Sequence, residues 1–159
     1  MKRLLDPLQR GLRLMLTRCV GLLVNSSNKM QTLQVRSMSP NPLDGIEHFE
    51  SYGFTSNPHP GFEGILAALG SHRSNTICLV AADRRYRVTG LLTGEVAIHD
   101  DLGQSIILHR DRIEITAPQG LEIIGDVNVT GDVIANGISL VNHTHGGVEP
   151  GGGNTGAPQ

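Results

Sequence analysis

Residues 120–147, GLEIIGDVNVTGDVIANGISLVNHTHGG, decide the fold, because a turn motif repeats along them at a fixed interval. Glycines recur every six residues at Gly125, Gly131 and Gly137, and the hexads GDVNVT and GDVIAN are near copies. Apolar and polar residues alternate between the glycines, which predicts short strands with one apolar face. The run ends on the sequence His143-Thr144-His145, followed by a glycine-rich tail.

The same alternation starts near residue 95, and turn residues interrupt it every six to ten positions. The apolar pairs with a spacing of two are Ile106/Leu108, Ile113/Ile115, Leu121/Ile123, Val127/Val129, Val133/Ala135 and Ile138/Leu140. One copy of such short strands has nowhere to bury its apolar face. The strands are also too short and too irregularly spaced for a single-chain coil with constant rungs. Three chains wound round one axis would bury these faces and leave no open edge, so residues 95–141 are predicted to form the shaft of a trimeric β-helix, a triangular prism.

The composition fits a thin β structure in the second half of the chain. Aromatic residues make up 3% of the sequence, and none follows Tyr86. Large rings normally supply much of the area buried in a globular core. The formal net charge of −2 gives no basic bias, and no nucleic-acid partner is predicted. We predict no signal peptide, because Arg13 and Arg18 interrupt the apolar stretch from Leu12 to Val24. We predict no membrane span, because no apolar run approaches about 20 residues.

Residues 1–19 are predicted to form an N-terminal amphipathic segment, helical over residues 2–19. Apolar residues recur there at helical spacing, with five basic residues and one acid between them. Such a helix can lie on a membrane surface. Packing on its own domain or on a partner protein is the favoured interpretation, because the arginines are spread around the helix.

Residues 20–94 change to short strands separated by turn residues, which is typical of a small closed barrel or a sandwich. The predicted strands are Val20–Val24, Gln31–Arg36, Phe49–Tyr52, Gly64–Ala68, Thr76–Ala81 and Tyr86–Leu92. Cys19 and Cys78 stand in apolar surroundings and are interpreted as small buried hydrophobic residues in a reducing compartment.

Two clusters in this region resemble binding surfaces. Phe49, Tyr52, Phe54 and Phe62 lie close in sequence, but acidic residues accompany them. They are therefore interpreted as core or interface and not as a base-stacking platform. A solvated turn or an ion pair between chains explains the arginines around Tyr86 at least as well as a binding site does.

His143 and His145 are the candidate metal ligands. They are two residues apart, so in an extended chain both side chains project to the same side. Three symmetry-related chains would bring six imidazoles to the axis, which suits a six-coordinate ion such as iron better than zinc. The alternative is that both histidines are surface residues in a polar tail.

An enzyme is not predicted. In several metal hydrolases, a histidine pair with this spacing is the first ligand motif along the chain. Those sites need further histidine and carboxylate ligands on later strands. After His145 the only acid is Glu149, and no histidine follows. A metal-dependent hydrolase is kept as the weakest alternative.

The motifs MQTLQVR, HFESYGFTSNPHPGFEG, DRRYRVTGLLTGEVAIHDDLGQSIIL and HTHGGV, together with the Gly-Asp repeats, resemble the Mu-type baseplate assembly protein V family of contractile-tailed phages. The resemblance covers about residues 15–147. It implies an OB-type domain, placed here at residues 20–94, a trimeric β-helix and a pointed apex. Residues 142–159 are predicted to be the metal-binding apex and tail, and the tail after His145 departs from the family pattern. The resemblance also implies that His143 and His145 of three chains share one iron ion per trimer.

The same resemblance implies a homotrimeric central spike at the tip of a phage tail or of a tail-like bacteriocin. Such a spike docks to the tail hub and baseplate and punctures the host outer membrane when the sheath contracts. The alternative is a hub adaptor that never contacts lipid. Synthesis in the host cytoplasm is expected in either case.

Overall fold

The structure, a computed structural model, describes residues 15–70, 75–145, 147 and 151. Every regular element within these residues is a strand, which confirms the all-β prediction for this part of the chain. The chain divides into two compact units, Met1–Pro118 and Gln119–Gln159. The segment limits predicted at residues 19, 94 and 141 stay predictions. No helix in the described ranges is long and apolar enough to cross a membrane.

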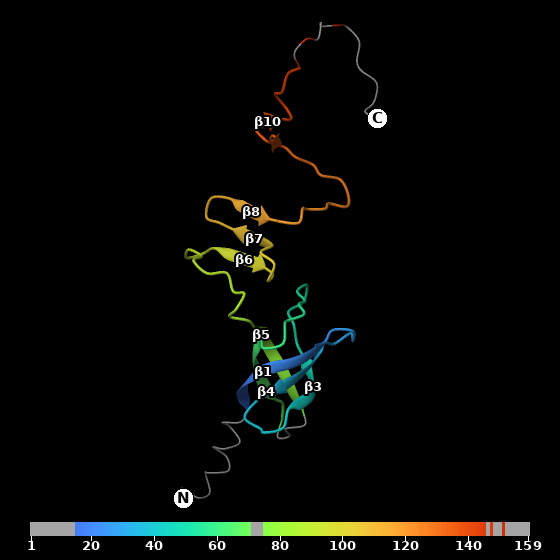
Figure 1. Cartoon of the computed structure of the whole chain (residues 1–159), viewed down its shortest axis with the longest axis vertical. Coiled ribbons are helices and arrows are strands. Elements are labelled where there is room, and N and C mark those ends of the chain that lie inside the picture. Colours follow the sequence, from blue (N-terminus) through green and yellow to red (C-terminus); the bar gives the residue numbers. More distant parts are fainter. Residues whose placement is uncertain (1–14, 71–74, 146, 148–150, 152–159) are drawn as a thin grey trace, which may run out of the picture. The chain divides into compact units, whose positions relative to one another are not determined.

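Five strands of the first unit close a barrel in the order β1-β2-β3-β5-β4 (Figure 1). They are β1 (Leu16–Asn25), β2 (Thr32–Arg36), β3 (Leu43–His48), β4 (Glu63–Ala68) and β5 (Thr76–Ala82). Neighbours pair antiparallel, except that β3 and β5 run parallel. Pairing of β1 with β4 closes the barrel, so of the two predicted architectures the closed barrel is confirmed and the sandwich is wrong.

The barrel core follows from alternation along its strands. On β2, Leu33 and Val35 are buried while Arg36 is exposed. The largest fully buried side chains are Phe62, Leu33, Leu66, Val35 and Cys78. Cys19 and Cys78 are both buried and free, as predicted.

Phe62 fills the barrel because Gly21 leaves room for its ring. A Cβ atom at Gly21 would lie 1.8 Å from the nearest ring carbon of Phe62, well inside van der Waals contact. The backbone N–H of Gly21 donates to the carbonyl of Phe62 at 2.8 Å, and the N–H of Gly61 donates to the carbonyl of Gly21 at 2.9 Å. Strand β1 and the segment before β4 are therefore held at a distance that only glycine permits.

Three secondary-structure predictions in this unit are wrong, each for a physical reason. Residues 16–19 belong to β1 and not to a helix, because Leu16–Val20 pair with β4 and this pairing overrides helical spacing. Residues 2–14 of the predicted helix lie outside the described residues, and Met15 directly precedes β1. The segment 49–52 is not a strand, because Glu50 accepts hydrogen bonds from Thr55 and Ser56 and folds the chain into a loop.

The segment 86–92 is not a strand either, since the N–H of Tyr86 donates to the carbonyl of Asp83 and closes a turn. Strand β3 was not predicted, because Asp44-Gly45 resembles a hairpin turn. In the structure Gly45 has φ +67° and stands at a register shift between β2 and β3. A glycine in this conformation is typical of a β-bulge, which continues the strand.

The first unit also contains a three-stranded antiparallel sheet, β6 (Val96–His99), β7 (Ser105–Leu108) and β8 (Ile113–Thr116). The second unit contains one two-stranded ribbon, β9 (Ile134–Ala135) and β10 (Ile138–Ser139). Asn136 and Gly137 join β9 to β10 with φ +50° and +80°. Positive φ at both central residues is typical of a type I′ hairpin turn, for which Asn-Gly is the preferred sequence.

Candidate functional site

One face of the three-stranded sheet is entirely apolar. Val96 lies opposite Leu108, and Ile98 opposite Ile106, in the pairing of β6 with β7. The same two β7 residues lie opposite Ile113 and Ile115 of β8. Directly opposed residues share a face, so the six side chains form one surface, and they are 39 to 67% exposed. The predicted alternation at Ile106/Leu108 and Ile113/Ile115 is therefore confirmed.

The large apolar side chains that the structure describes in the second unit are exposed. The large ones between residues 121 and 141 are all 42 to 93% exposed: Leu121, Ile123, Ile124, Val127, Val129, Val133, Ile134, Ile138, Leu140 and Val141. Single exposed apolar residues are ordinary on a soluble protein, whereas a contiguous series marks an interaction surface. We call the exposed apolar residues of positions 96–141 the shaft surface.

His143 and His145 lie side by side at the end of the β9–β10 hairpin. Their ring centroids are 5.0 Å apart and their planes are inclined by 80°. Both residues are exposed. The structure thus brings together the two site residues predicted from the sequence.

The ring of His143 is oriented by the backbone. Its Nδ1 lies 3.0 Å from the carbonyl oxygens of both Ser139 and Leu140. A carbonyl oxygen only accepts, so Nδ1 must carry the proton and donate. Nε2 then keeps its lone pair, and a neutral imidazole nitrogen with a lone pair is the form that binds a metal.

One chain supplies too few ligands for a metal shell. No group of three or more His, Cys, Asp or Glu side chains that could hold an ion occurs in the part of the chain that the structure describes. The donor set of His143 and His145 fits a first-row ion only when copies of the chain add further imidazoles. The iron assignment stays a prediction.

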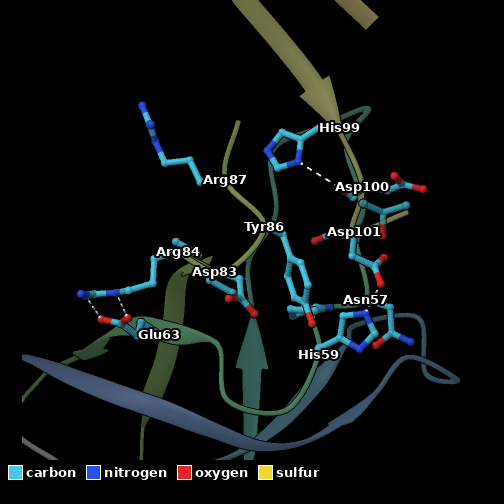
Figure 2. A pocket seen from close by; sticks show the side chains of 15 residues that line it. Asn57, His59, Glu63, Asp83, Arg84, Tyr86, Arg87, His99, Asp100 and Asp101 are labelled. Carbon is cyan, nitrogen blue, oxygen red and sulfur yellow. Dashed lines mark hydrogen bonds and ion pairs between the residues drawn. The ribbon is translucent and has the colours of Figure 1, made fainter. Parts of the chain in front are cut away.

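A pocket of about 750 Å³ lies in the first unit, lined by the loop before β4, the segment after β5 and the turn between β6 and β7 (Figure 2). His59 Nε2 lies 3.0 Å from Oδ2 of Asp101, and the ring of His59 lies against that of Tyr86 with centroids 5.4 Å apart. Arg84 pairs with Glu63 at the rim.

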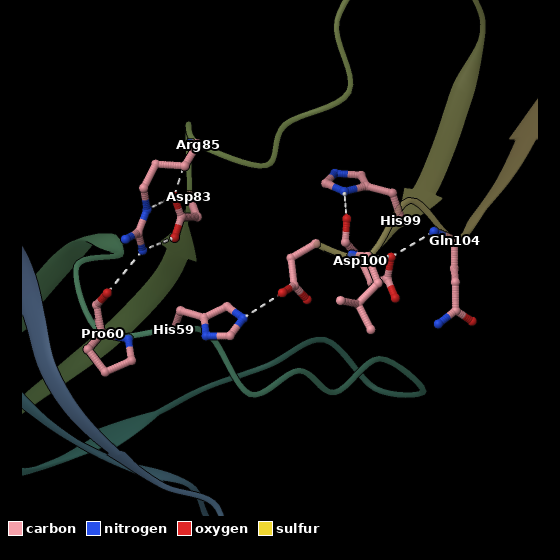
Figure 3. Close-up of polar contacts among 9 residues, drawn as sticks. His59, Pro60, Asp83, Arg85, His99, Asp100 and Gln104 are labelled. Carbon is pink, nitrogen blue, oxygen red and sulfur yellow. Dashed lines mark hydrogen bonds and ion pairs between the residues drawn. The ribbon is translucent and has the colours of Figure 1, made fainter. Parts of the chain in front are cut away.

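Arg85 and Asp83 form a second ion pair in this region (Figure 3). Arg85 Nη2 donates to Asp83 Oδ2 at 2.5 Å and to the carbonyl of Pro60 at 3.0 Å. The hydrogen bond from Arg85 lowers the pKa of Asp83 to about 2. Arg84 and Arg85 are therefore paired with acids of their own chain, whereas the sequence suggested a solvated turn or a pair between chains.

A second charged cluster lies at the edge of the three-stranded sheet. His109 Nδ1 lies 3.0 Å from Glu95 Oε1, and His109 Nε2 lies 3.6 Å from Glu114 Oε2. The N–H of Leu92 donates to Glu95, and this bond, followed by the one from His109, lowers the pKa of Glu95. The cluster ties the entry of β6 to the turn between β7 and β8.

Sequence reasoning missed several residues with defined roles. Gln31 Oε1 accepts a hydrogen bond from His48 Nδ1 at 2.9 Å inside the barrel, and burial lowers the pKa of His48. Asp132 Oδ1 accepts from the N–H of Val141, and the Ser139 hydroxyl accepts from the N–H of Asn142. The sequence carries one signal for Asp132, namely its place in the second Gly-Asp repeat.

The aromatic cluster divides between core and surface. Phe62 is fully buried, whereas Phe49, Tyr52 and Phe54 are exposed. Gly53 has φ +83°, and the N–H of Phe54 donates to the carbonyl of Ser51 at 3.0 Å. The interpretation as core is right for Phe62 alone, and the interface role of the others stays a prediction.

Comparison with known proteins identifies the kind of protein. Residues 18–85 match the family described as Bacteriophage Mu Gp45, N-terminal, and residues 137–159 match the GpV Apex motif. The chain is 38% identical over 132 residues to the "Baseplate puncturing device gp45" of Escherichia phage Mu, covering 83% of this chain and 67% of that protein. It is 30% identical over 169 residues to the "Mu-like prophage FluMu protein gp45" of Haemophilus influenzae, covering 90% of this chain and 92% of that protein.

An all-β chain with a closed barrel, an exposed shaft surface and an apex motif defines a class: the baseplate spike proteins of phage tails. The chain belongs to the Mu gp45 family. The resemblance found in the sequence is thereby confirmed, and so is its association with a phage baseplate. The structural role of these relatives also supports the interpretation that the chain is not an enzyme.

Proposed function

We propose that the chain forms a homotrimeric spike at the tip of a contractile phage tail, and that this spike punctures the host outer membrane when the sheath contracts. The observation that carries the proposal is the shaft surface, whose apolar side chains remain exposed in the part of the chain that the structure describes. Burial of one Val, Leu or Ile side chain contributes about 1.5–3 kcal/mol. A surface with this many such residues favours assembly strongly.

The occupant of the shaft surface is a second and a third copy of the same chain. The strands of residues 96–139 are two to four residues long, so each copy supplies only a narrow strip. Three strips facing one axis form a triangular prism whose interior accepts Val, Ile and Leu but no ring. A prism of this kind has no open sheet edge, which prevents pairing with unrelated strands.

The barrel serves as the base of the spike. The order β1-β2-β3-β5-β4 with one parallel pair supports assignment to the OB type, a five-stranded barrel. Three barrels would form a wide platform that docks to the tail hub. A stiff shaft on such a base concentrates the contraction force on a small area, and the name of the phage Mu relative, a puncturing device, supports this role.

The tip is proposed to hold one iron ion per trimer, bound by His143 and His145 of three chains. The fit rests on the exposed pair of rings and on the free Nε2 of His143. When bound, the ion supplies a link between the three chain ends, where strands would otherwise separate most easily.

Native mass measured together with metal content tests the assembly and the tip. We expect a mass about three times the 17.0 kDa of one chain, with one iron per assembly. The double variant His143→Ala/His145→Ala should remain trimeric and lose the iron. A stable monomer would refute the spike, whereas a metal-free trimer would refute only the tip site.

Membrane contact is tested separately from assembly. Trimers added to dye-loaded vesicles of lipopolysaccharide and phospholipid should cause leakage, and the non-assembling Val133→Asp variant is the control. A trimer that binds the baseplate but releases no dye would favour the adaptor function. Synthesis in the host cytoplasm, followed by assembly into the tail, is part of the same proposal.

A further inference from the structure

The hydrogen bonds behind His143 form a continuous series from the hairpin to the ring. The carbonyls of Ser139 and Leu140 both accept from His143 Nδ1 at 3.0 Å. The carbonyl of Ser139 also accepts from the backbone N–H of His143 at 3.1 Å. The ring therefore has two fixed acceptors on one side, and they determine which nitrogen carries the proton.

These two carbonyls are themselves held in place. Ser139 pairs with Ile134 across the β9–β10 ribbon, and the N–H of Leu140 donates to the carbonyl of Val133 at 2.9 Å. The N–H of Asn142 donates to Ser139 Oγ at 2.8 Å. The turn that follows β10 is thus fastened to the side chain of Ser139.

Asp132, in the segment just before β9, completes the series. Its Oδ1 accepts from the N–H of Val141 at 3.2 Å, and its carboxylate is hydrogen-bonded to the side chain of Ser139. A carboxylate only accepts, so the Ser139 hydroxyl donates to Asp132 and accepts from Asn142. Both roles of the hydroxyl are satisfied.

The preceding Gly-Asp repeat provides an internal comparison. Asp126 occupies the position in GDVNVT that Asp132 occupies in GDVIAN. In the described ranges, no hydrogen bond or ion pair involves the side chain of Asp126, while Asp132 binds two groups of the tip. The role of Asp132 therefore comes from its place beside the hairpin and not from the repeat itself.

We propose that Asp132 and Ser139 are positioning residues that hold the His143 ring as the Nδ1–H tautomer and present Nε2 at the tip. The inference deepens the proposed metal site and rests on it only for the identity of the ligand. Residues that orient metal-binding imidazoles typically change metal affinity about 10- to 100-fold when removed. The side chains of Asp132 and Ser139 influence the ring by fixing the backbone carbonyls that bind it, and they do not bind the ion.

The deciding experiment measures the tautomer of His143 in the metal-free, full-length protein by nitrogen-15 NMR of the imidazole. The wild type and Asp126→Ala should show one tautomer, with the proton on Nδ1. Asp132→Ala and Ser139→Ala should show a second population with the proton on Nε2, and Asp132→Asn, which keeps one acceptor oxygen, should restore most of the first. A wild type with mixed tautomers, or variants identical to the wild type, would overturn the proposal.

Iron affinity gives the second measurement. Asp132→Ala and Ser139→Ala should bind iron about tenfold more weakly at unchanged stoichiometry, and Asp126→Ala should bind as the wild type does. Equal affinities in all four proteins would overturn the positioning role. Absence of iron from the wild type would refute the proposed metal site alone, because the tautomer measurement needs no metal.

Discussion

The barrel and the shaft surface use the same apolar residues in opposite ways. In the barrel, Phe62, Leu33 and Val35 are at most 1% exposed, and every barrel strand pairs with two neighbours of its own chain. On the shaft surface, Val127 and Val133 remain about half exposed, and the ribbon of the second unit has only two short strands. A single chain therefore completes the barrel, whereas in the proposed trimer other copies would complete the shaft.

This difference implies that the two regions respond to different variables. Stability of the barrel depends on packing within one chain, so it should not change with protein concentration. In the proposed trimer, the stability of the shaft includes association, so it should rise with protein concentration. Substitutions in one region should therefore leave the other region intact.

A charge on the shaft surface should prevent assembly of the shaft without changing the barrel. Val127→Asp or Val133→Asp would place three like charges at one level of the proposed axis, and an unpaired buried charge costs several kcal/mol. We expect monomers by light scattering, with circular dichroism still reporting a folded barrel.

Asn128→Asp is the matched control for charge. It adds the same carboxylate next to Val127, on the opposite face of an extended chain. This variant should stay trimeric. Normal assembly of both valine variants would place these side chains outside the prism.

The second prediction damages the barrel and leaves the shaft. Phe62→Ala removes the largest fully buried side chain and should destabilise the barrel by about 3–5 kcal/mol. Calorimetry should show the unfolding transition of the barrel at a much lower temperature. Below that temperature, the native mass should remain that of a trimer. Phe54→Ala, at an exposed ring, should change the free energy of unfolding by less than about 0.5 kcal/mol. Loss of trimers in Phe62→Ala would mean that the barrel also drives assembly.

The sequence predicted those elements that depend on local pattern. Strands β1, β2, β4 and β5 were found because apolar alternation and flanking turns mark them. Strand β3 was missed because Asp44-Gly45 has the composition of a turn, and only pairing with β2 makes it a bulge. The start of β1 was assigned to a helix for the same reason, since its partner β4 lies more than 40 residues away in sequence.

The candidate site shows the same limit. His143 and His145 are adjacent enough in sequence for their spacing to carry the prediction. Asp132 and Ser139 meet only because the Asn136-Gly137 turn folds β10 back on β9. Periodicity describes one strand at a time, so contacts that depend on hairpin register are not visible to it.

The third prediction concerns the turn that carries the tip. Gly137 has φ +80°, a conformation that costs a residue with a Cβ about 1–2 kcal/mol. Gly137→Ala should therefore destabilise the β9–β10 hairpin and increase the rate at which protease cleaves the tip. The transition temperature of the barrel should not change. Gly137→Asn is the control at the same position, because asparagine tolerates positive φ better. Equal trimming rates for the two variants would show that the turn does not limit stability of the tip.

The smallest expected effect is the pH dependence of the first unit. The pKa of Asp83 is lowered to about 2 by the hydrogen bond from Arg85, and the pKa of Glu95 is lowered by bonds from Leu92 and His109. A carboxyl group whose pKa is lower in the folded than in the unfolded chain stabilises the fold above its unfolded pKa. This contribution should be complete at neutral pH and be lost as the pH falls from about 4.5 towards 2. The transition temperature of the barrel, measured by circular dichroism, should fall over this interval.

Asp83→Asn sharpens the test, because the amide cannot titrate. This variant should begin at a slightly lower transition temperature at neutral pH and lose less of it in acid. The change is expected to be small because Arg85 is about half exposed and solvent screens the pair. Glu122→Gln removes a shaft carboxylate that has no hydrogen bond or ion pair within the described residues, and its barrel transition should follow the wild type at every pH. If Asp83→Asn and the wild type lose stability in parallel below pH 4.5, the Asp83–Arg85 pair does not contribute to folding, and the acid response must come from groups elsewhere in the chain.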